Sequence, residues 1–216
     1  LMSGDGELSW STAKRLFMPV LSNLSTLHKH GIVHGSLSPA TLLIDQHSNI
    51  YLSGLSLSGI YDCEVTADSP DKGYHAPEQF FRSGFQGPWT DVYSMGAVLY
   101  KCLTGTMPTD ALTRRAGNRL LSISQLGGGD TPENVSQAVE SAMALDKEQR
   151  PQTIDTFIGR LLECESSNTA VYTAPKPAAA LDAVRILDEE DEEPDSTQLA
   201  EREPKPLRPS TQASTA

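Results

Sequence analysis

The chain has 216 residues, with 28 acidic and 17 basic side chains that give a formal net charge of −11. This length fits one domain with an additional segment, and the acidity argues against nucleic acid or an anionic membrane as the main partner. No run of roughly 18 apolar residues is present, so we expect no membrane insertion. The first residues lack the regions of a signal peptide. The chain begins with Leu1 rather than Met, which suggests a fragment or a trimmed product.

The three cysteines, Cys63, Cys102 and Cys164, lie far apart in the sequence. Their odd number and the absence of a Cys-x-x-Cys pair argue against a disulfide framework or a zinc site. A reducing, cytoplasmic environment fits such a chain best. We expect Cys102 to be a small core residue and the other two cysteines to be incidental.

The first part of the chain reads as mostly helical. Ser9 or Ser11 can cap a first helix, whose apolar residues recur at helical spacing until Gly31 ends it. Two short strand-like runs follow, at 41–44 and 50–52, and a polar turn joins them. This pattern predicts a β-hairpin directly after the helix.

A stretch rich in glycine and proline, 53–87, separates the hairpin from a helix that Thr90 caps and Gly105 stops. The apolar residues of this helix cover most of its circumference, which is typical of a buried helix. Two amphipathic helices close the domain, one over 132–145 and one capped by Thr153. The fold class we expect is mainly α with a short β-hairpin.

The composition changes near residue 165, where we place the end of the folded domain (1–165). Residues 166–216 contain six prolines, the acidic run 188–193 and a single aromatic residue, Tyr172. Such a segment cannot bury enough apolar area to offset its ordering entropy, so we predict an acidic, Pro-rich disordered tail. Residues 178–188 could form a short helix, in a segment that is either a solvated linker or a docking motif that folds on a partner.

Four sequence motifs occur in one order along the chain: 32–44, 73–78, 90–96 and 146–151. Together they resemble the C-terminal lobe of a protein kinase. The first is similar to the catalytic loop, His-Arg-Asp-Leu-x-x-x-x-Asn, and the second to the Ala-Pro-Glu end of the activation segment. The third resembles the start of the central buried helix, and the fourth the loop before the last helix. The passage 87–91 is most similar to bacterial Ser/Thr kinases.

The catalytic positions that this resemblance assigns are all altered. The family's base is Ser36 here, the Lys that contacts the γ-phosphate is Ser38, and the two metal ligands are Thr41 and Gly54. Gly35 stands where the family often has an Arg that pairs with a phosphorylated activation segment. A hydroxyl without a neighbouring base cannot accept a proton at neutral pH, and Mg²⁺ prefers carboxylate and phosphate oxygens. We therefore expect no intact catalytic, cofactor or metal site in this chain.

The structural positions of the family are retained as His34, Glu78, Asp91 and Arg150. The resemblance implies that Glu78 and Arg150 form a buried ion pair between the activation segment and the lower helices. It also implies that Asp91 accepts hydrogen bonds from the catalytic-loop backbone and that His34 packs in the interior. Retention of these residues beside loss of the catalytic set favours a pseudokinase-like lobe. The chain shows no glycine-rich loop and no strand Lys, so we interpret the N-terminal lobe as absent from it.

Other features mimic functional sites. His28 and His30 lie two positions apart, which does not fit a helical metal pair, so we expect His30 to interact with the helix end instead. Ser36 with His34 lacks the third member of a hydrolase triad. The glycine run 127–129 follows no strand and precedes no phosphate-binding Lys, so we interpret it as a flexible loop.

We therefore expect a catalytically inactive, cytoplasmic module that acts in binding, scaffolding or regulation. Its protein partner would dock on the helical lobe or on the acidic tail. The alternative is a fragment of a Ser/Thr protein kinase. In that case the full-length protein would carry the other lobe and would use ATP and Mg²⁺ for phosphotransfer.

Overall fold

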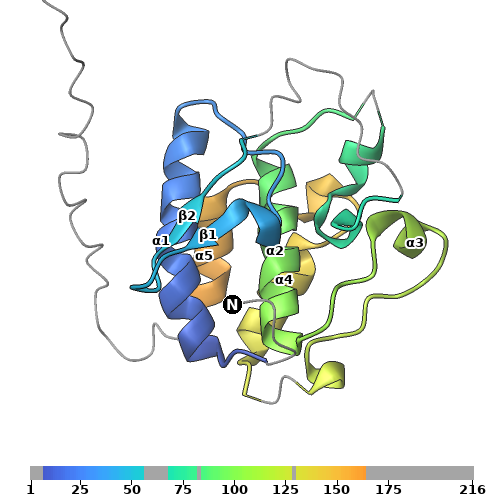
Figure 1. Cartoon of the computed structure of the whole chain (residues 1–216). Helices are drawn as coiled ribbons and strands as arrows, with labels where there is room; N and C mark the ends of the chain where they lie inside the picture. The colour runs from blue at the N-terminus through green and yellow to red at the C-terminus, as the bar shows by residue number, and fades with distance from the viewer. Residues whose placement is uncertain (1–6, 56–67, 82–83, 128–129, 164–216) are drawn as a thin grey trace, which may run out of the picture. The chain divides into compact units, whose positions relative to one another are not determined.

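The structure, a computed structural model, describes residues 7–55, 68–81, 84–127 and 130–163. These ranges form a mainly helical fold with a two-stranded antiparallel sheet (Figure 1). The helices and strands are α1 (Trp10–Lys29), β1 (Leu42–Ile44), β2 (Ile50–Leu52), α2 (Pro88–Thr104), α3 (Ala111–Arg115), α4 (Glu133–Ala142) and α5 (Ile154–Leu162). Short 3₁₀ turns lie between them: η1 (Pro39–Thr41), η2 (Lys72–Tyr74), η3 (Pro77–Phe80), η4 (Ser124–Leu126) and η5 (Lys147–Gln149).

Helix α1 begins after Ser9, which is the one of the two predicted caps that the chain uses. The Ser9 hydroxyl accepts the backbone N–H of Thr12 at 3.4 Å. The helix ends at Lys29, and Gly31 follows with a φ of +75°, a conformation that glycine adopts without strain. His30 Nδ1 lies 2.9 Å from the carbonyl oxygen of Thr26, so this histidine does contact the last helical turn.

The hairpin pairs Leu42 with Leu52 and Ile44 with Ile50 in antiparallel register. Its turn is held by the Asp45 carboxylate, which accepts the backbone N–H groups of residues 47 and 49. Hydrogen bonds from residue 49, from both its side chain and its backbone, lower the pKa of Asp45 to about 2. The first strand begins one residue later than predicted, because position 41 belongs to η1.

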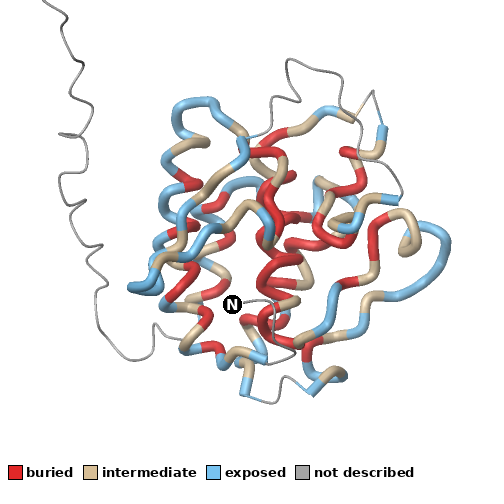
Figure 2. The backbone as a smooth tube through the Cα atoms, viewed as in Figure 1, coloured by how far each residue is buried: buried red, intermediate tan, exposed pale blue. Residues whose placement is uncertain are grey.

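Helix α2 is the buried centre of the fold, as its apolar circumference predicts. Its residues from Thr90 to Tyr100 are all buried (Figure 2). The predicted cap was wrong: the helix begins at Pro88, where a proline is tolerated, and Gly87 is the capping residue. Thr90 lies in the first turn, and its hydroxyl accepts the N–H of Gly87 at 3.1 Å. The helix ends at Gly105 as predicted, with a φ of +65°.

The remaining helices pack around α2. Gly96 lets α4 approach α2 closely, because a Cβ at this position would lie 2.9 Å from the Cβ of Ala142. Helix α4 ends at Ala142, three residues before the predicted end, since Met143 already leaves helical geometry. Helix α3 was not predicted; it is five residues long, and Asp110 caps it by accepting the N–H of Thr113.

Several sequence predictions lie outside the described residues. These are the boundary near residue 165, the tail 166–216 with its short helix, Cys63 and Cys164. Cys102 is a buried core thiol, and burial raises its pKa to about 12. No helix within the described ranges has the length and hydrophobicity to cross a bilayer.

Candidate active site

The altered catalytic loop runs from the end of α1 to β1. Its polar side chains form hydrogen bonds that stabilise the backbone of the loop. The Ser38 hydroxyl accepts the N–H of Ala40 at 3.2 Å, and the Thr41 hydroxyl accepts the N–H of Ser38 at 3.0 Å. This reciprocal pattern is a capping box around η1. Serine and threonine at these positions therefore satisfy the backbone of the turn that carries them.

The hydroxyl groups of the loop also donate hydrogen bonds to neighbouring acceptors. Ser36 Oγ donates to the carbonyl of Gly54 at 2.5 Å, and Ser38 Oγ donates to Asp71 Oδ2 at 3.2 Å. The Thr41 hydroxyl donates to the carbonyl of Ser36 at 3.0 Å. Ser36 thus faces a backbone carbonyl, which cannot act as a base at neutral pH.

The positions that would hold Mg²⁺ do not fit the metal. Gly54 supplies no carboxylate and has a φ of +69°. A Cβ at Gly54 would lie 3.2 Å from Cγ2 of Thr41, so the two positions also crowd one another. Thr41 offers a hydroxyl that is already bonded within the loop. Across the described ranges, no group of three or more His, Cys, Asp or Glu side chains is placed to hold a metal ion.

Asp91, in the first turn of α2, accepts hydrogen bonds from the backbone of the catalytic loop. Its two carboxylate oxygens accept the N–H groups of His34 and Gly35, each at 2.8 Å. His34 is fully buried, and its pKa is lowered because desolvation outweighs the attraction of Asp91. A second histidine, His28, places Nε2 2.7 Å from Asp91 Oδ2. The contact of His28 with Asp91 could not be predicted from the sequence, because no local spacing indicates a partner 63 positions away.

Glu78 and Arg150 meet in the interior. Arg150 Nη1 and Nη2 donate to the two oxygens of Glu78 at 2.8 and 3.0 Å. Thr90 donates to the same carboxylate at 2.8 Å, and the guanidinium lies 5.0 Å from the ring centre of Tyr93. Desolvation alone would raise the pKa of Glu78, but the hydrogen bonds and charge of Arg150 overcome it and the pKa is lowered.

Two residues that the sequence analysis did not single out, Gln79 and Asp71, contact the loop from the activation segment. Gln79 Nε2 donates to the carbonyl of Gly35 at 2.6 Å, and its Oε1 accepts the N–H of Ala76 at 2.9 Å. Asp71 accepts the Ser38 hydroxyl. The local half of the Gln79 arrangement, a glutamine three residues after the start of a turn, is a readable capping signal. The contact with Gly35 is not local and could not be read.

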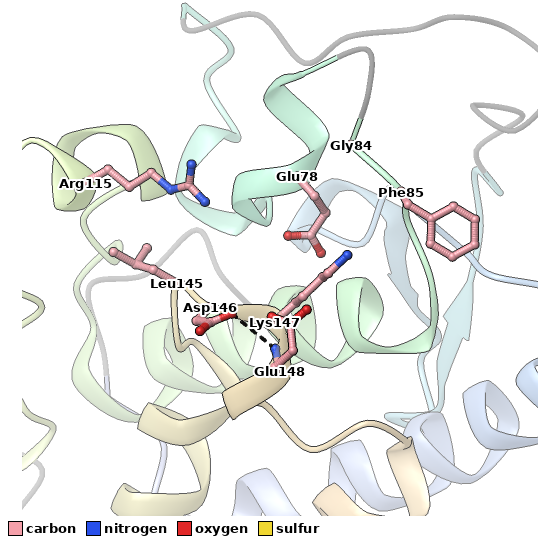
Figure 3. A pocket seen from close by; sticks show the side chains of 8 residues that line it. All are labelled: Glu78, Gly84, Phe85, Arg115, Leu145, Asp146, Lys147 and Glu148. Atoms are coloured by element: carbon pink, nitrogen blue, oxygen red, sulfur yellow. Dashed lines mark hydrogen bonds between the residues drawn. The ribbon is translucent and has the colours of Figure 1, made fainter.

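A pocket of about 490 Å³ is lined in part by Glu78 (Figure 3). Its lining combines Glu78, Arg115 and Lys147 with Phe85, whose ring is largely exposed. None of the four altered catalytic positions lines this pocket. The pocket is therefore separate from those four positions.

Two solved structures share the fold of this chain. The apo form of PpkA-294 superposes with a TM-score of 0.61 at 26% identity, covering 71% of this chain and 54% of that one. The kinase domain of PknI from Mycobacterium tuberculosis gives a TM-score of 0.55 at 18% identity, covering 73% of this chain and 56% of that one. The second likeness concerns the fold alone.

Curated relatives point to the same family. CBL-interacting protein kinase 17 of Oryza sativa subsp. japonica is 34% identical over 112 residues, which are 49% of this chain and 24% of the relative. Serine/threonine-protein kinase SIK2 of Gallus gallus is 34% identical over 113 residues, 50% of this chain and 14% of the relative. The chain thus spans a quarter or less of these relatives. Because the protein kinase domain family matches residues 1–170, most of its length, the chain belongs to that family.

Proposed function

We propose that this chain is a catalytically silent kinase-like module that acts by binding a protein partner. One observation carries the proposal: the hydroxyls at Ser36, Ser38 and Thr41 form hydrogen bonds within and around their own loop. A base, a phosphate-binding cation and metal ligands would have to occupy these positions for catalysis. The hydroxyls found there instead donate to Gly54, to Asp71 and to the loop's own backbone.

The chemistry of phosphoryl transfer explains why the residues at these positions matter. Transfer requires an oriented acceptor hydroxyl, a cation on the phosphates and Mg²⁺ held by oxygen ligands. Ser38 carries no charge to place on a phosphate, and Gly54 carries no oxygen on a side chain. The retained contacts of Asp91 and of Glu78 with Arg150 serve the fold and supply none of these groups. This set of residues best supports a folded lobe that does not catalyse phosphoryl transfer.

The partner in this proposal is a protein. It docks on the helical lobe or on the acidic residues 188–193, which would attract a basic surface. On the lobe, exposed Phe81 and Phe85 offer apolar contact area near the pocket. The net charge of −11 disfavours nucleic acid, and the cysteine pattern supports a cytoplasmic setting.

The alternative proposal is ATP-dependent phosphotransfer by the natural protein that contains this chain. The names of the curated relatives support it, because both are protein kinases, one of them a serine/threonine-protein kinase, and this chain matches only part of each. The Asp71 carboxylate lies 3.2 Å from the Ser38 hydroxyl, which places an acidic group beside one of the altered catalytic positions. Under this alternative the full-length protein carries the other lobe, and the altered residues of this chain still permit weak phosphotransfer.

Nucleotide binding distinguishes the two proposals. The thermal unfolding midpoint of the natural protein is measured with ATP, with Mg²⁺ and with both. A ligand at 100 times its dissociation constant stabilises the folded state by about 2.7 kcal/mol, which is easily seen. We expect no Mg²⁺-dependent rise. A rise with ATP and Mg²⁺ together that exceeds the rise with ATP alone would support the alternative.

A further inference from the structure

Residues of η3, α3 and η5 line the pocket described above, which we call the Phe85 pocket (Figure 3). Its volume of about 490 Å³ lies in the range of pockets that accept a ligand. Phe85, 72% exposed, forms one side of the pocket, and Arg115 lies on the opposite side. Leu145, which is half-buried, adds apolar surface to the lining. The pocket thus presents an exposed aromatic ring together with a cation.

Two cations of the Phe85 pocket, Arg115 and Lys147, lie over aromatic rings. The guanidinium carbon of Arg115 is 5.8 Å from the ring centre of Phe81, and Lys147 Nζ is 5.6 Å from that of Trp89. Within the described ranges, neither cation has a carboxylate oxygen at ion-pair distance. Because a ring orients a cation without cancelling its charge, both cations remain available to the carboxylates of a partner.

The carboxylates of the Phe85 pocket are less available than its cations. Glu78 is paired with Arg150, and Asp146 accepts the N–H of Glu148 at 3.4 Å as the cap of η5. Among the described residues of the lining, the exposed Glu148 is left as the one carboxylate without such a contact. Two cations without an ion pair face one such carboxylate. The pocket is therefore complementary to an acidic ligand, although the net charge of the chain is −11.

The wall that carries Phe85 is held in place by its neighbours. The N–H of Gly84 donates to the carbonyl of Phe81 at 2.8 Å. A Cβ at Gly84 would overlap the carbonyl oxygen of Glu78, so the backbone packs directly against η3. The ring centres of Phe85 and Trp89 are 6.0 Å apart, a distance typical of paired aromatic rings. A wall fixed in this way needs little ordering when a ligand binds.

We propose that the Phe85 pocket binds an acidic peptide segment of a partner protein. An apolar side chain of that segment packs against Phe85 and Leu145, and its carboxylates pair with Arg115 and Lys147. Aromatic residues and arginine are enriched at protein interfaces, so the lining has the composition of such a site. The proposal rests on the binding role given above and names the chemistry of the partner. Peptide affinity tests it, whereas radiolabel transfer tests catalytic silence, so the two can fail separately.

Fluorescence anisotropy of labelled peptides tests the proposal on the whole chain, 1–216. The acidic probe is Glu-Asp-Glu-Phe-Leu-Asp-Glu, and the basic probe has lysine in place of every Glu and Asp. We expect the acidic probe to bind at least about tenfold more tightly than the basic probe, and its affinity to fall as the salt concentration rises. A dissociation constant of the acidic probe above about 1 mM, or equal or tighter binding of the basic probe, would overturn the proposal.

Charge variants locate the binding site. Arg115→Glu and Lys147→Glu should each weaken binding of the acidic probe about tenfold or more, whereas Glu148→Lys should tighten it about threefold or more. Lys29→Glu is the matched control, because it makes the same change of net charge at an exposed residue outside the pocket. An equal loss of affinity in Lys29→Glu, or no gain in Glu148→Lys, would show that the probe binds elsewhere, and the proposal would fail.

The aromatic side of the pocket is tested separately. Phe85→Ala should weaken binding of the acidic probe about tenfold or more, because the apolar side chain of the probe loses its contact. Tyr51→Ala is the control, since Tyr51 is also exposed, at 55%, and lies outside the pocket on β2. Urea midpoints confirm that each variant folds. Unchanged affinity in Phe85→Ala, or an equal loss in Tyr51→Ala, would overturn the assignment of this pocket.

Discussion

Glu78 and Arg150 lie 72 positions apart in the sequence and form a two-pronged ion pair, with N–O distances of 2.8 and 3.0 Å. The side chain of Arg150 is fully buried and that of Glu78 is 9% exposed. The pair joins η3 to the loop before α5. Because water is nearly excluded, each charge depends on the other for its stabilisation.

The first prediction concerns truncation of this pair. Glu78→Ala or Arg150→Ala strands one charge in a low-dielectric site, so each should lower the free energy of unfolding by about 3–5 kcal/mol. The double variant should cost clearly less than the sum, because no orphan charge remains. Urea midpoints of the three variants measure these effects.

The exposed pair of Lys29 and Asp155 provides the control. Their N–O distance is 3.1 Å, but their side chains are 67% and 57% exposed. Lys29→Ala should change the free energy of unfolding by about 0.5 kcal/mol or less. Small and additive effects at Glu78 and Arg150, like those of the control, would contradict the contact described here.

The second prediction is an acid dependence carried by Glu78. Its pKa is lowered in the folded state from the ordinary value of 4.5. A lowered carboxyl pKa adds stability that is present above pH 4.5 and is lost as the pH falls through the folded value. Glu78→Gln should therefore lose less stability than the natural chain between pH 5 and the acid limit of folding. Parallel stability curves for the two proteins in that range would disprove the assignment.

The third prediction concerns two desolvated histidines at milder pH, the buried His34 and the half-buried His75. Desolvation is the largest influence on His34 and His75, and it lowers the pKa of both from 6.5. The unfolded chain then binds more protons than the folded chain below pH 6.5, so stability falls as the pH falls through this range. Each unit of pKa depression contributes about 1.4 kcal/mol. His75→Phe should flatten the stability curve between pH 7 and 5, and chemical denaturation across that range measures this slope. An unaltered slope would count against a desolvated, neutral His75.

The fourth prediction compares two histidines near the end of α1. His28 contacts the buried carboxylate of Asp91, whereas His30 lies on the exposed surface. His28→Ala should lower the free energy of unfolding by about 1–3 kcal/mol, because a buried charge loses a partner. His30→Ala should change it by about 0.5 kcal/mol or less. Equal effects of the two substitutions in urea would refute the role given to His28.

Much of the fold is predictable because its signals are local. Ser9 and Thr153 are recognisable caps, and the glycines that end α1 and α2 stand where the apolar periodicity stops. The start of α2 was misplaced because Thr90 is an attractive cap by residue type. The proline and glycine before it, Pro88 and Gly87, determine the true start. Helix α3 was missed because five residues are too few for a periodic pattern.

The candidate site is likewise predictable where its signals are local and unpredictable where its contacts join distant residues. The altered residues at 36, 38, 41 and 54 follow from a motif and are read directly from the sequence. Their hydrogen-bond partners do not, since the contact of Ser38 with Asp71 joins residues that only the folded chain brings together. Gln79 is similar, because its bond to Gly35 spans 44 positions. Tertiary contacts of this kind leave no pattern in the sequence.

The most direct test of a silent lobe is radiolabel transfer from γ-labelled ATP to a generic protein substrate. The assay uses the natural protein that contains this chain, with Mg²⁺, a heat-killed sample and the Asp71→Asn variant. The account predicts no transfer above the heat-killed sample for either protein, because Ser36 and Gly54 supply neither base nor metal ligand. Transfer above that background by the natural protein, lost in Asp71→Asn, would contradict the account and show that the Asp71 carboxylate serves catalysis at the altered loop.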